Sequence, residues 1–320
     1  MNGDDNTSPA KRPRKESLSQ ESSSSQRQSS RNQTHHAPSN HQQAPFNGVH
    51  PPTPILSATN GSAGPSLSSD LDIHKTRFAS EPLLPPLGQV SYNYKDRRKA
   101  AVVASICQRD EPSPVLDLLR ELSSDPVNPD LPAALDIDAV LDDQGHTALH
   151  MAASLGRLQI VDTLILNGAH IHRGNYLGES PLIRACLATH NADQQTFSSL
   201  VVALNLSIRT LDTSRKSVLH HIVSLAGVKG RAVAARYYLD QIFLWIAQQQ
   251  GGDFRSLVDL QDEHGDTALN IAARVGNRSL VRTLLDVGAN RILPNKLGLR
   301  PGDFGVETEV SPLTFLRYDP

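Results

Sequence analysis

Apolar and small residues recur in the same order in two segments of the chain, one beginning at Asp142 and the other at Asp262. Each segment contains an acidic residue, a glycine, a Thr-Ala-Leu triplet, a small-residue stretch, a second glycine, a Leu/Val-rich stretch and a final Gly-Ala. In the first copy, Val161, Leu164 and Ile165 share one face of a helix expected over 158–166. The pattern predicts pairs of short helices that bury their apolar faces only by stacking on neighbouring copies.

The turn glycines set the period of the repeat. Gly145 and Gly178 are 33 residues apart, as are Gly265 and Gly298, and this spacing is typical of ankyrin repeats. A further copy is degenerate, because Arg215 stands where the turn glycine is expected. We predict an all-α ankyrin-repeat solenoid with irregular insertions. Its parts are capping helices within 92–141, repeats over 142–174, 175–210, 211–261 and 262–294, a partial repeat over 295–305, and a C-terminal tail over 306–320.

Two insertions interrupt the period. From Gly178 to Arg215 is 37 residues, which places about four extra residues around 189–196. From Arg215 to Gly265 is 50 residues, which places about 17 extra residues near 227–254. The second insertion predicts one long helix over 232–248. Its apolar side chains at helical spacing form either core or a ridge that binds a partner; they are Tyr238, Ile242, Trp245 and Ile246.

Glycines, threonines and histidines at fixed places in the copies predict structural roles. The glycines supply positive φ in turns or end helices, and the threonines cap helices through their hydroxyl groups. His150 and His220 align between copies, and both are expected to be buried and bonded to the backbone of adjacent turns. His170 and His172 are expected to be exposed. The structural set is Gly145, Thr147, His150, Gly156, Gly168, Gly178, His220, Gly265, Thr267, Gly276 and Gly288.

The polar turns at the start of the two clearest copies are candidates for partner binding. These residues either only stabilise the turns in which they lie, or they contact a partner directly at the tips of the array. They are Asp142, Asp143, His146, Asp262, Glu263 and Asp266.

The first 91 residues differ in composition from the rest. Residues 1–90 hold 11 of the 21 prolines and 16 serines, so this tail is predicted to be disordered. A basic cluster of Lys11, Arg12, Arg14 and Lys15 is typical of nuclear-import signals. Just upstream, Ser8 begins a Ser-Pro-x-Lys sequence, the pattern that cyclin-dependent kinases phosphorylate. Phosphorylation of Ser8 is expected to weaken importin binding and so to slow nuclear entry. Thr53 followed by proline is a weaker kinase candidate.

Charge and cysteine content narrow the function classes. The chain has 31 basic and 33 acidic residues, and residues 91–320 carry 23 basic and 26 acidic residues, which disfavours a phosphate-binding surface. Cys107 and Cys186 are predicted to be reduced core residues of an intracellular protein. We find no nucleotide-binding fingerprint, paired zinc-ligand pattern or membrane-length apolar run, and adjacent His220 and His221 point about 100° apart on a helix. We expect that the protein is not an enzyme and that it binds no cofactor, metal, membrane or small-molecule ligand.

Three segments go beyond a generic ankyrin repeat: GESPLIRACLATHNADQQTF (178–197), TSRKSVLHHIVS (213–224) and AARYYLDQIFLWIA (234–247). With the irregular spacing, residues 92–305 resemble the ankyrin region of fungal cell-cycle-box transcription factors of the MBF and SBF type. The tail resembles the linker that precedes this region. In that family, DNA-binding subunits carry an N-terminal APSES domain, regulatory subunits lack a working one, and a C-terminal helical region joins the subunits.

The resemblance implies a protein-interaction scaffold of a nuclear complex that regulates cell-cycle entry, with shuttling to the cytoplasm as an option. Its expected partners are an APSES-domain DNA-binding subunit or a regulatory subunit, together with transcriptional regulators. We expect DNA to be reached only indirectly, either through the rest of the complex or through an APSES domain that this sequence does not include. We expect a fragment of a DNA-binding subunit rather than a shortened regulatory subunit. The alternative is a free-standing ankyrin adaptor or inhibitor with no link to DNA.

Overall fold

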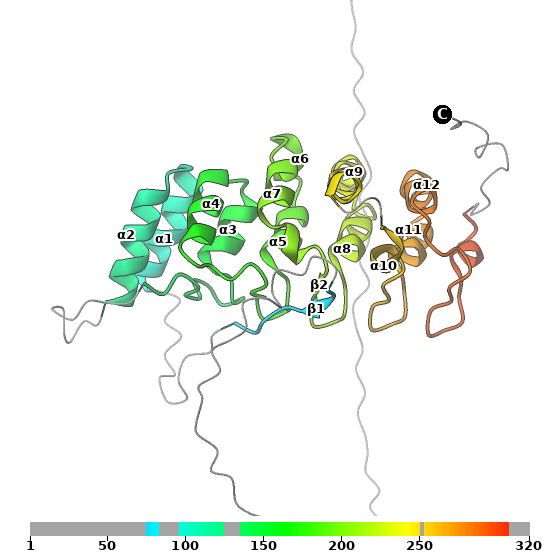
Figure 1. Cartoon of the computed structure of the whole chain (residues 1–320), viewed down its shortest axis with the longest axis horizontal. Coiled ribbons are helices and arrows are strands. Elements are labelled where there is room, and N and C mark those ends of the chain that lie inside the picture. The colour runs from blue at the N-terminus through cyan, green and yellow to red at the C-terminus, as the bar shows by residue number, and fades with distance from the viewer. Residues whose placement is uncertain (1–74, 83–95, 125–134, 250–252, 307–320) are drawn as a thin grey trace, which may run out of the picture. The chain divides into compact units, whose positions relative to one another are not determined.

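Short helices follow one another in pairs along the chain, and each pair packs on the next (Figure 1). The structure is a computed structural model that describes residues 75–82, 96–124, 135–249 and 253–306. The inner helices of successive repeats pack in series and are α3 Ala148–Ser154, α5 Pro181–Cys186, α8 Val218–Leu225 and α11 Ala268–Val275. The outer helices are α4 Leu158–Leu166, α7 Phe197–Ala203, α9 Ala232–Gln249 and α12 Arg278–Asp286. The predicted ankyrin-repeat fold is confirmed.

The N-terminal cap is a helix pair that packs on α3 and α4. It consists of α1 Arg97–Gln108 and α2 Pro112–Ser123. The carboxylate of Asp110, in the connection, accepts hydrogen bonds from the backbone N–H groups of Gln159 and Ile160 at 3.1 and 3.0 Å. It thereby satisfies donors that the first turn of α4 leaves open. Pro112 lies at the start of α2, where a missing N–H costs no helical bond.

Cys107 is exposed, so its predicted place in the core is wrong. Val102 and Ile106 occupy the buried face of α1. Because the next residue on a helix is rotated by about 100°, Cys107 turns away from that face. Cys186, in α5, is fully buried and belongs to the core, and burial raises the pKa of its thiol.

The first insertion forms an extra helical turn, α6 His190–Asp193, rather than a plain loop. The second lengthens the outer helix of the third repeat, so that α9 has 18 residues whereas α4 has nine. Tyr238 joins the two insertions: its hydroxyl donates to the carbonyl of Ala188 at 2.6 Å and accepts from the N–H of Ala192 at 3.0 Å. Tyr238, Ile242 and Ile246 are buried and Trp245 is partly buried, which favours core over a binding ridge.

A segment before the cap runs along the array as a strand, which we call the strap (residues 75–82). Its β1 Arg77–Phe78 pairs in parallel with β2 Thr210–Leu211, and Ser80 forms a further bridge with Arg173. The prediction of disorder over 1–91 is therefore wrong for these residues. The strap is held by backbone pairing with distant loops, which composition does not reveal.

The remaining described elements are short. They are η1 Asn205–Ser207, α10 Arg255–Val258 and η2 Pro301–Phe304, the last of which replaces a helix in the final unit. None of the helices in the described ranges is both long and apolar enough to cross a bilayer. The predicted import cluster, Ser8, Thr53 and the C-terminal tail beyond residue 306 lie outside the described residues.

Candidate functional site

Five turns with the same internal geometry project from the array below the inner helices (Figure 1). An Asp or Asn begins each turn, and its Oδ1 accepts two backbone N–H groups, two and four residues later. In the first turn these bonds run from Gln144 and His146 to Asp142, at 3.0 and 2.9 Å. The same pair of bonds fixes the other four turns, which begin at Asn175, Asp212, Asp262 and Asn295.

The third residue after the Asp or Asn takes positive φ in every turn. Gly145, Gly178, Gly265 and Gly298 have φ of +84°, +75°, +76° and +78°, respectively. Arg215 adopts φ of 63° at the equivalent position of the third repeat. The degenerate copy therefore keeps the turn and carries a side chain in a left-handed conformation that glycine adopts more easily. Gly178 is also close-packed, since an added Cβ would lie 2.6 Å from the N of Thr213.

Backbone hydrogen bonds join each turn to the next. Each bond runs from an N–H of one turn to a carbonyl of the turn before it. The bonds are Tyr176 N to Gln144 O (2.9 Å), Thr213 N to Leu177 O (3.2 Å), Glu263 N to Ser214 O (2.9 Å) and Lys296 N to His264 O (3.0 Å). The five turns therefore form one continuous, internally braced surface rather than five independent loops.

Buried polar side chains brace the turns from below. His146 is 4% exposed; its Nδ1 lies 2.7 Å from Asp142 Oδ2, and its Nε2 lies 3.1 Å from Asn175 Nδ2. Burial raises the pKa of Asp142, but the hydrogen bonds from His146 outweigh it and the net shift is downward. In the fourth repeat, Asp266 accepts from Asn295 and pairs with Arg274. These groups stabilise the turns.

Two histidines link neighbouring repeats, as the sequence predicts. Nε2 of His150 lies 3.0 Å from the carbonyl oxygen of Glu179, and Nε2 of His220 lies 3.0 Å from that of Asp266. The Nδ1 of His150 accepts the backbone N–H of Thr147 at 3.2 Å, so its proton is on Nε2. Burial lowers the pKa of His150 to about 3, and it also lowers the pKa of His220. Both rings are therefore neutral at physiological pH.

Asn270 occupies the equivalent position in the fourth repeat and makes the same set of bonds. Its Oδ1 accepts the N–H of Thr267 at 3.1 Å, and its Nδ2 donates to the carbonyl of Leu299 at 3.2 Å. A neutral side chain with an acceptor and a donor is therefore sufficient at this position.

The predicted partner-binding turns separate into buried and exposed residues. Asp142 is half-buried, while His146, Asp262 and Asp266 are buried and bonded within the protein. Of the six, only Asp143 and Glu263 are exposed to solvent. His146, Asp262 and Asp266 offer little free surface for a direct contact, because their side chains bond to groups within the turns.

We define the tip row as the exposed residues at the ends of the five turns. It includes large apolar side chains that the sequence pattern did not single out: Leu177 is 62% exposed and Leu297 is 82% exposed. Exposed apolar side chains that lie together are candidates for contact with a partner, as Tyr176 and Leu177 do in the second turn. The tip row comprises Asp143, Gln144, Tyr176, Leu177, Thr213, Arg215, Glu263, His264, Lys296 and Leu297.

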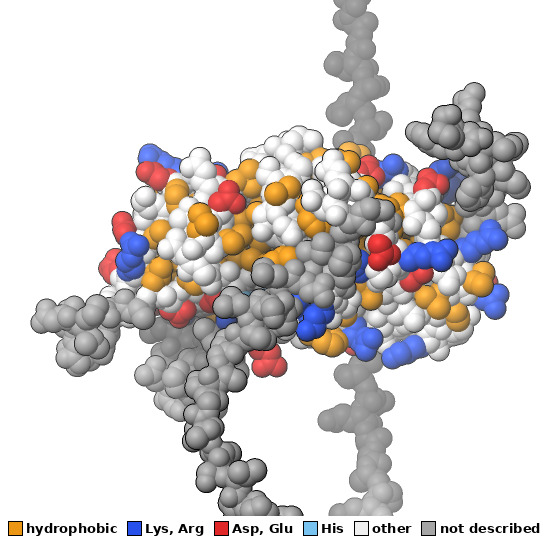
Figure 2. Space-filling view, viewed as in Figure 1, with side chains coloured by type: hydrophobic (Ala, Val, Ile, Leu, Met, Phe, Trp, Pro, Cys, Tyr) orange, Lys and Arg blue, Asp and Glu red, His pale blue; other side chains and the backbone are white. Residues whose placement is uncertain are grey.

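The charge of the tip row changes along its length. Asp143 lies at the N-terminal end, whereas Lys296 lies at the C-terminal end beside exposed Arg291 and Arg300. Figure 2 shows Lys and Arg side chains gathered over the end of the array that carries α11 and α12. A partner that lies along the row would meet an acidic start and a basic end.

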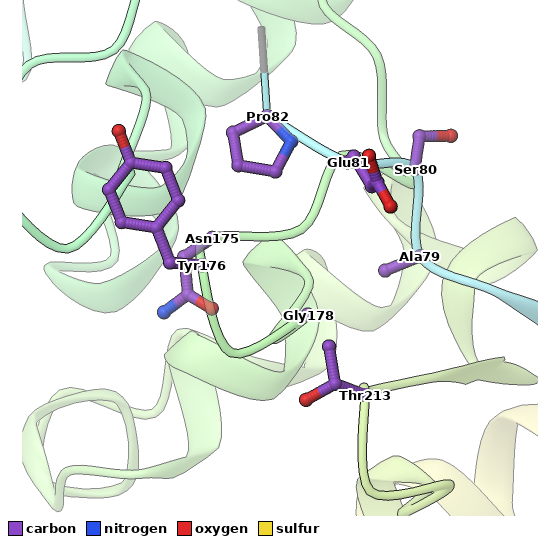
Figure 3. A pocket seen from close by; sticks show the side chains of 8 residues that line it. All are labelled: Ala79, Ser80, Glu81, Pro82, Asn175, Tyr176, Gly178 and Thr213. Atoms are coloured by element: carbon purple, nitrogen blue, oxygen red, sulfur yellow. The ribbon is translucent and has the colours of Figure 1, made fainter. Parts of the chain in front are cut away.

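A half-open cavity of about 220 Å³ lies where the strap crosses the second turn (Figure 3). Ala79 and Pro82 line it from the strap, and Tyr176, Gly178 and Thr213 line it from the turns. Within the described part of the chain, no cluster of His, Cys, Asp or Glu has the arrangement of a metal site.

The structure corrects the expectation for His172. This residue is 3% exposed, and its Nδ1 lies 2.8 Å from Thr210 Oγ1 in β2. His170 is half-buried. The strap and β2 cover this loop, so a position after a helix end is not at the surface here.

Family models support the repeats. Residues 149–194 match the model for ankyrin repeats (many copies), and residues 264–296 match the model for a single ankyrin repeat. Among solved structures, the chain is similar to the ankyrin-repeat fragment of Saccharomyces cerevisiae SWI6. It is 32% identical with a TM-score of 0.61, and the match covers 80% of this chain and 100% of that fragment.

Curated fungal proteins match the same part of the chain. The Start control protein cdc10 of Schizosaccharomyces pombe is 40% identical over 183 residues, which is 55% of this chain and 24% of that protein. The regulatory protein SWI6 of Saccharomyces cerevisiae is 34% identical over 206 residues (54% and 26%). The transcription factor MBP1 of that yeast is 35% identical over 165 residues (51% and 19%). The chain therefore spans about a quarter or less of the length of these relatives.

Proposed function

Since this chain belongs to the family of ankyrin-repeat regions represented by the SWI6 fragment, we propose that it is a protein-interaction scaffold of a nuclear transcription complex. The complex is of the MBF and SBF type and regulates transcription at cell-cycle entry. The observation that carries the proposal is the match to the whole of the SWI6 ankyrin fragment at 32% identity. The relatives named above are a Start control protein, a regulatory protein and a transcription factor, and none has the name of an enzyme.

The tip row is the surface that we assign to partner binding. Its backbone is braced by hydrogen bonds between successive turns, so a partner would find the exposed side chains already positioned. Leu177 and Leu297 supply apolar contact area, and Asp143 and Lys296 supply opposite charges that fix the orientation of the partner. The proposed partners are an APSES-domain DNA-binding subunit or a regulatory subunit, and transcriptional regulators.

Contact with DNA is proposed to be indirect. Residues 91–320 carry 23 basic and 26 acidic residues, and a surface that neutralises phosphates needs a clear excess of Lys and Arg. Specific DNA contact is therefore assigned to an APSES-domain partner or domain. No cofactor, membrane or small-molecule ligand forms part of the proposal.

Nuclear action follows from the proposed role, and the basic cluster at Lys11–Lys15 is the proposed import signal. Phosphate on Ser8 would add about −1.5 to −2 charges next to this cluster. A Ser8→Asp protein is expected to enter nuclei more slowly than wild type. Equal nuclear accumulation of the two proteins would contradict this assignment.

Affinity purification of the endogenous protein tests the proposed function. Tagged protein from nuclear extract is passed over immobilised DNA with the cell-cycle box, and a scrambled box serves as the control. We expect the protein to be retained on the cell-cycle box together with an APSES-domain protein. Retention on neither DNA, with recovery only of partners that do not bind DNA, would favour a free-standing adaptor or inhibitor instead.

A further inference from the structure

Backbone hydrogen bonds hold the strap to the array. The N–H groups of Arg77 and Ala79 donate to the carbonyls of Arg209 and Leu211 at 3.3 and 2.9 Å. Ser80 uses both of its backbone groups, because its N–H donates to His172 O and its carbonyl accepts from Gly174 N, each at 2.8 Å. Lys75, Phe78 and Glu81 remain exposed. Such a short pairing opens more readily than the packed helices do.

The strap sequence reads Lys75-Thr-Arg77-Phe-Ala-Ser80-Glu-Pro82. Arginine lies three residues before Ser80 and lysine five residues before it. Protein kinases select substrates by charge patterns of this kind, in which acidic residues of the kinase pair with basic residues upstream of the acceptor. The motif is separate from Ser8 and Thr53, which are followed directly by proline.

Docking protects Ser80 from a kinase. The residue is half-buried and both of its backbone groups are bonded to the array. In Figure 3 its hydroxyl points away from Tyr176, whereas Ala79 points toward the cavity. A kinase must surround the acceptor hydroxyl in order to place it in line with the γ-phosphate of ATP. Phosphorylation therefore requires that the strap first leave the array.

Arg173 is the residue that a phosphate group on Ser80 would contact. Ser80 and Arg173 are paired across a bridge, so their side chains project from the same face. Arg173 Nη1 donates to the carbonyl of Glu81 at 2.7 Å, and Nη2 donates to Asp138 at 3.2 Å. Its Nε is buried and has no hydrogen-bond acceptor in the described part of the chain. The guanidinium thus lies beside Ser80 with an N–H available for a further acceptor.

We propose that Ser80 is a phosphorylation site for a kinase that reads upstream basic residues, and that the phosphate locks the strap onto Arg173. In the reaction the Ser80 hydroxyl oxygen bonds to the γ-phosphorus of ATP, the bond to the β-phosphate oxygen breaks, ADP leaves, and the hydroxyl proton passes to the kinase base. The phosphate has three strong acceptor oxygens and about −1.5 to −2 charges. When the strap docks again, these oxygens accept from the guanidinium of Arg173.

The lock has a structural consequence at the tip row. The strap covers the β2 edge and forms one wall of the cavity beside Tyr176 and Thr213. A phosphorylated chain therefore keeps this edge and cavity closed, while an unmodified chain opens them transiently. The inference rests on the strap geometry and does not depend on the proposed role in transcription.

The test uses the full chain with ATP and the catalytic subunit of a cyclic-AMP-dependent protein kinase. Mass spectrometry locates the phosphate, and hydrogen exchange measures protection of the Ala79 and Ser80 amides before and after modification. We expect phosphate on Ser80, added more slowly than to a peptide of residues 70–87, and amide exchange slower by about tenfold, as one charge-assisted hydrogen bond would give. Absence of phosphate on Ser80, or exchange that is unchanged or faster after modification, would overturn the proposal.

Two arginine variants separate the lock from a general charge effect. In Arg173→Gln the phosphate should still be added, but the slowing of exchange at Ala79 and Ser80 should be lost. Arg278 is exposed on α12, away from the strap, so Arg278→Gln should behave as wild type. Because each variant is compared with itself before and after modification, weaker docking of the unmodified Arg173→Gln strap does not obscure the result. Equal slowing in the two variants would contradict a role for Arg173.

Discussion

Nε2–H of His150 donates a hydrogen bond to the carbonyl oxygen of Glu179 in the next repeat, across 3.0 Å. His150 is 1% exposed, and its Nδ1 accepts the N–H of Thr147 in its own repeat. One neutral ring thus connects the start of an inner helix to the turn of the following repeat. The same link recurs at His220 and, with an amide, at Asn270.

Replacement of His150 should show how much this link stabilises the array. His150→Ala leaves the Thr147 N–H and the Glu179 carbonyl without their partner, and it is expected to lower the free energy of unfolding by about 2–4 kcal/mol. His150→Asn should recover at least half of this loss, because Asn270 makes the equivalent bonds. Urea unfolding followed by circular dichroism measures both. An alanine variant as stable as wild type would refute the link.

Stability should fall with acid because of the same ring. The folded protein keeps His150 neutral with a pKa of about 3, whereas the unfolded chain takes up the proton near pH 6.5. The contribution is complete above pH 6.5 and is lost as pH falls toward 3. Protonation of His150 in the unfolded chain should therefore lower the free energy of unfolding by about 2 kcal/mol between pH 7 and pH 5. In His150→Asn, the free energy of unfolding should fall by about 2 kcal/mol less over the same pH range. Parallel curves of unfolding free energy against pH for wild type and His150→Asn would contradict this prediction.

The third turn should be improved by glycine. Arg215 is exposed and holds φ of 63°, a conformation that costs a side-chain-bearing residue about 1 kcal/mol. Arg215→Gly is expected to raise the free energy of unfolding by about 0.5 kcal/mol, since the added freedom of the unfolded chain offsets part of the gain. Gly178→Ala is the opposite change and should destabilise by about 2 kcal/mol, because it adds strain and a close contact with Thr213. Thermal unfolding of both variants tests the assignment.

The two insertions should depend on Tyr238. Its hydroxyl bonds to the backbone of Ala188 and Ala192 on either side of the start of α6. Tyr238→Phe leaves these groups unsatisfied and is expected to cost about 1–3 kcal/mol. Tyr237 is the matched control, because it is partly buried and its ring centroid lies 5.7 Å from that of Tyr238. Tyr237→Phe should change stability by less than about 0.5 kcal/mol; equal effects of the two substitutions would be inconsistent with the structure.

The repeats could be predicted from the sequence because their signals are local and periodic. Glycines at a fixed spacing mark the turns, and residues such as Thr147 and His150 stand at constant offsets from them. The apolar periodicity after Arg231 likewise indicated the long helix. These features depend on neighbours within one turn or one repeat.

The strap and much of the tip row could not be predicted, because they depend on contacts between distant residues. Arg173 bonds to the carbonyl of Glu81 across a separation of 92 residues, and backbone pairing leaves no side-chain pattern to read. Polar turn residues also gave an incomplete picture of the surface. Asp262 and Asp266 are buried and brace the turns, while Leu177 and Leu297, which the repeat pattern does not single out, are exposed.

Retention of the chain on cell-cycle-box DNA by an APSES-domain partner tests the central claim most directly when combined with tip-row variants. We predict that the wild-type chain is retained on the box together with the APSES-domain protein. Leu177→Asp with Leu297→Asp should reduce recovery at least about tenfold, because it places charge in the apolar part of the tip row. Leu166→Asp is the control, since Leu166 is 85% exposed on α4, away from the turns. Absence of the wild-type chain from the box, or equal recovery of all three proteins, would contradict the account.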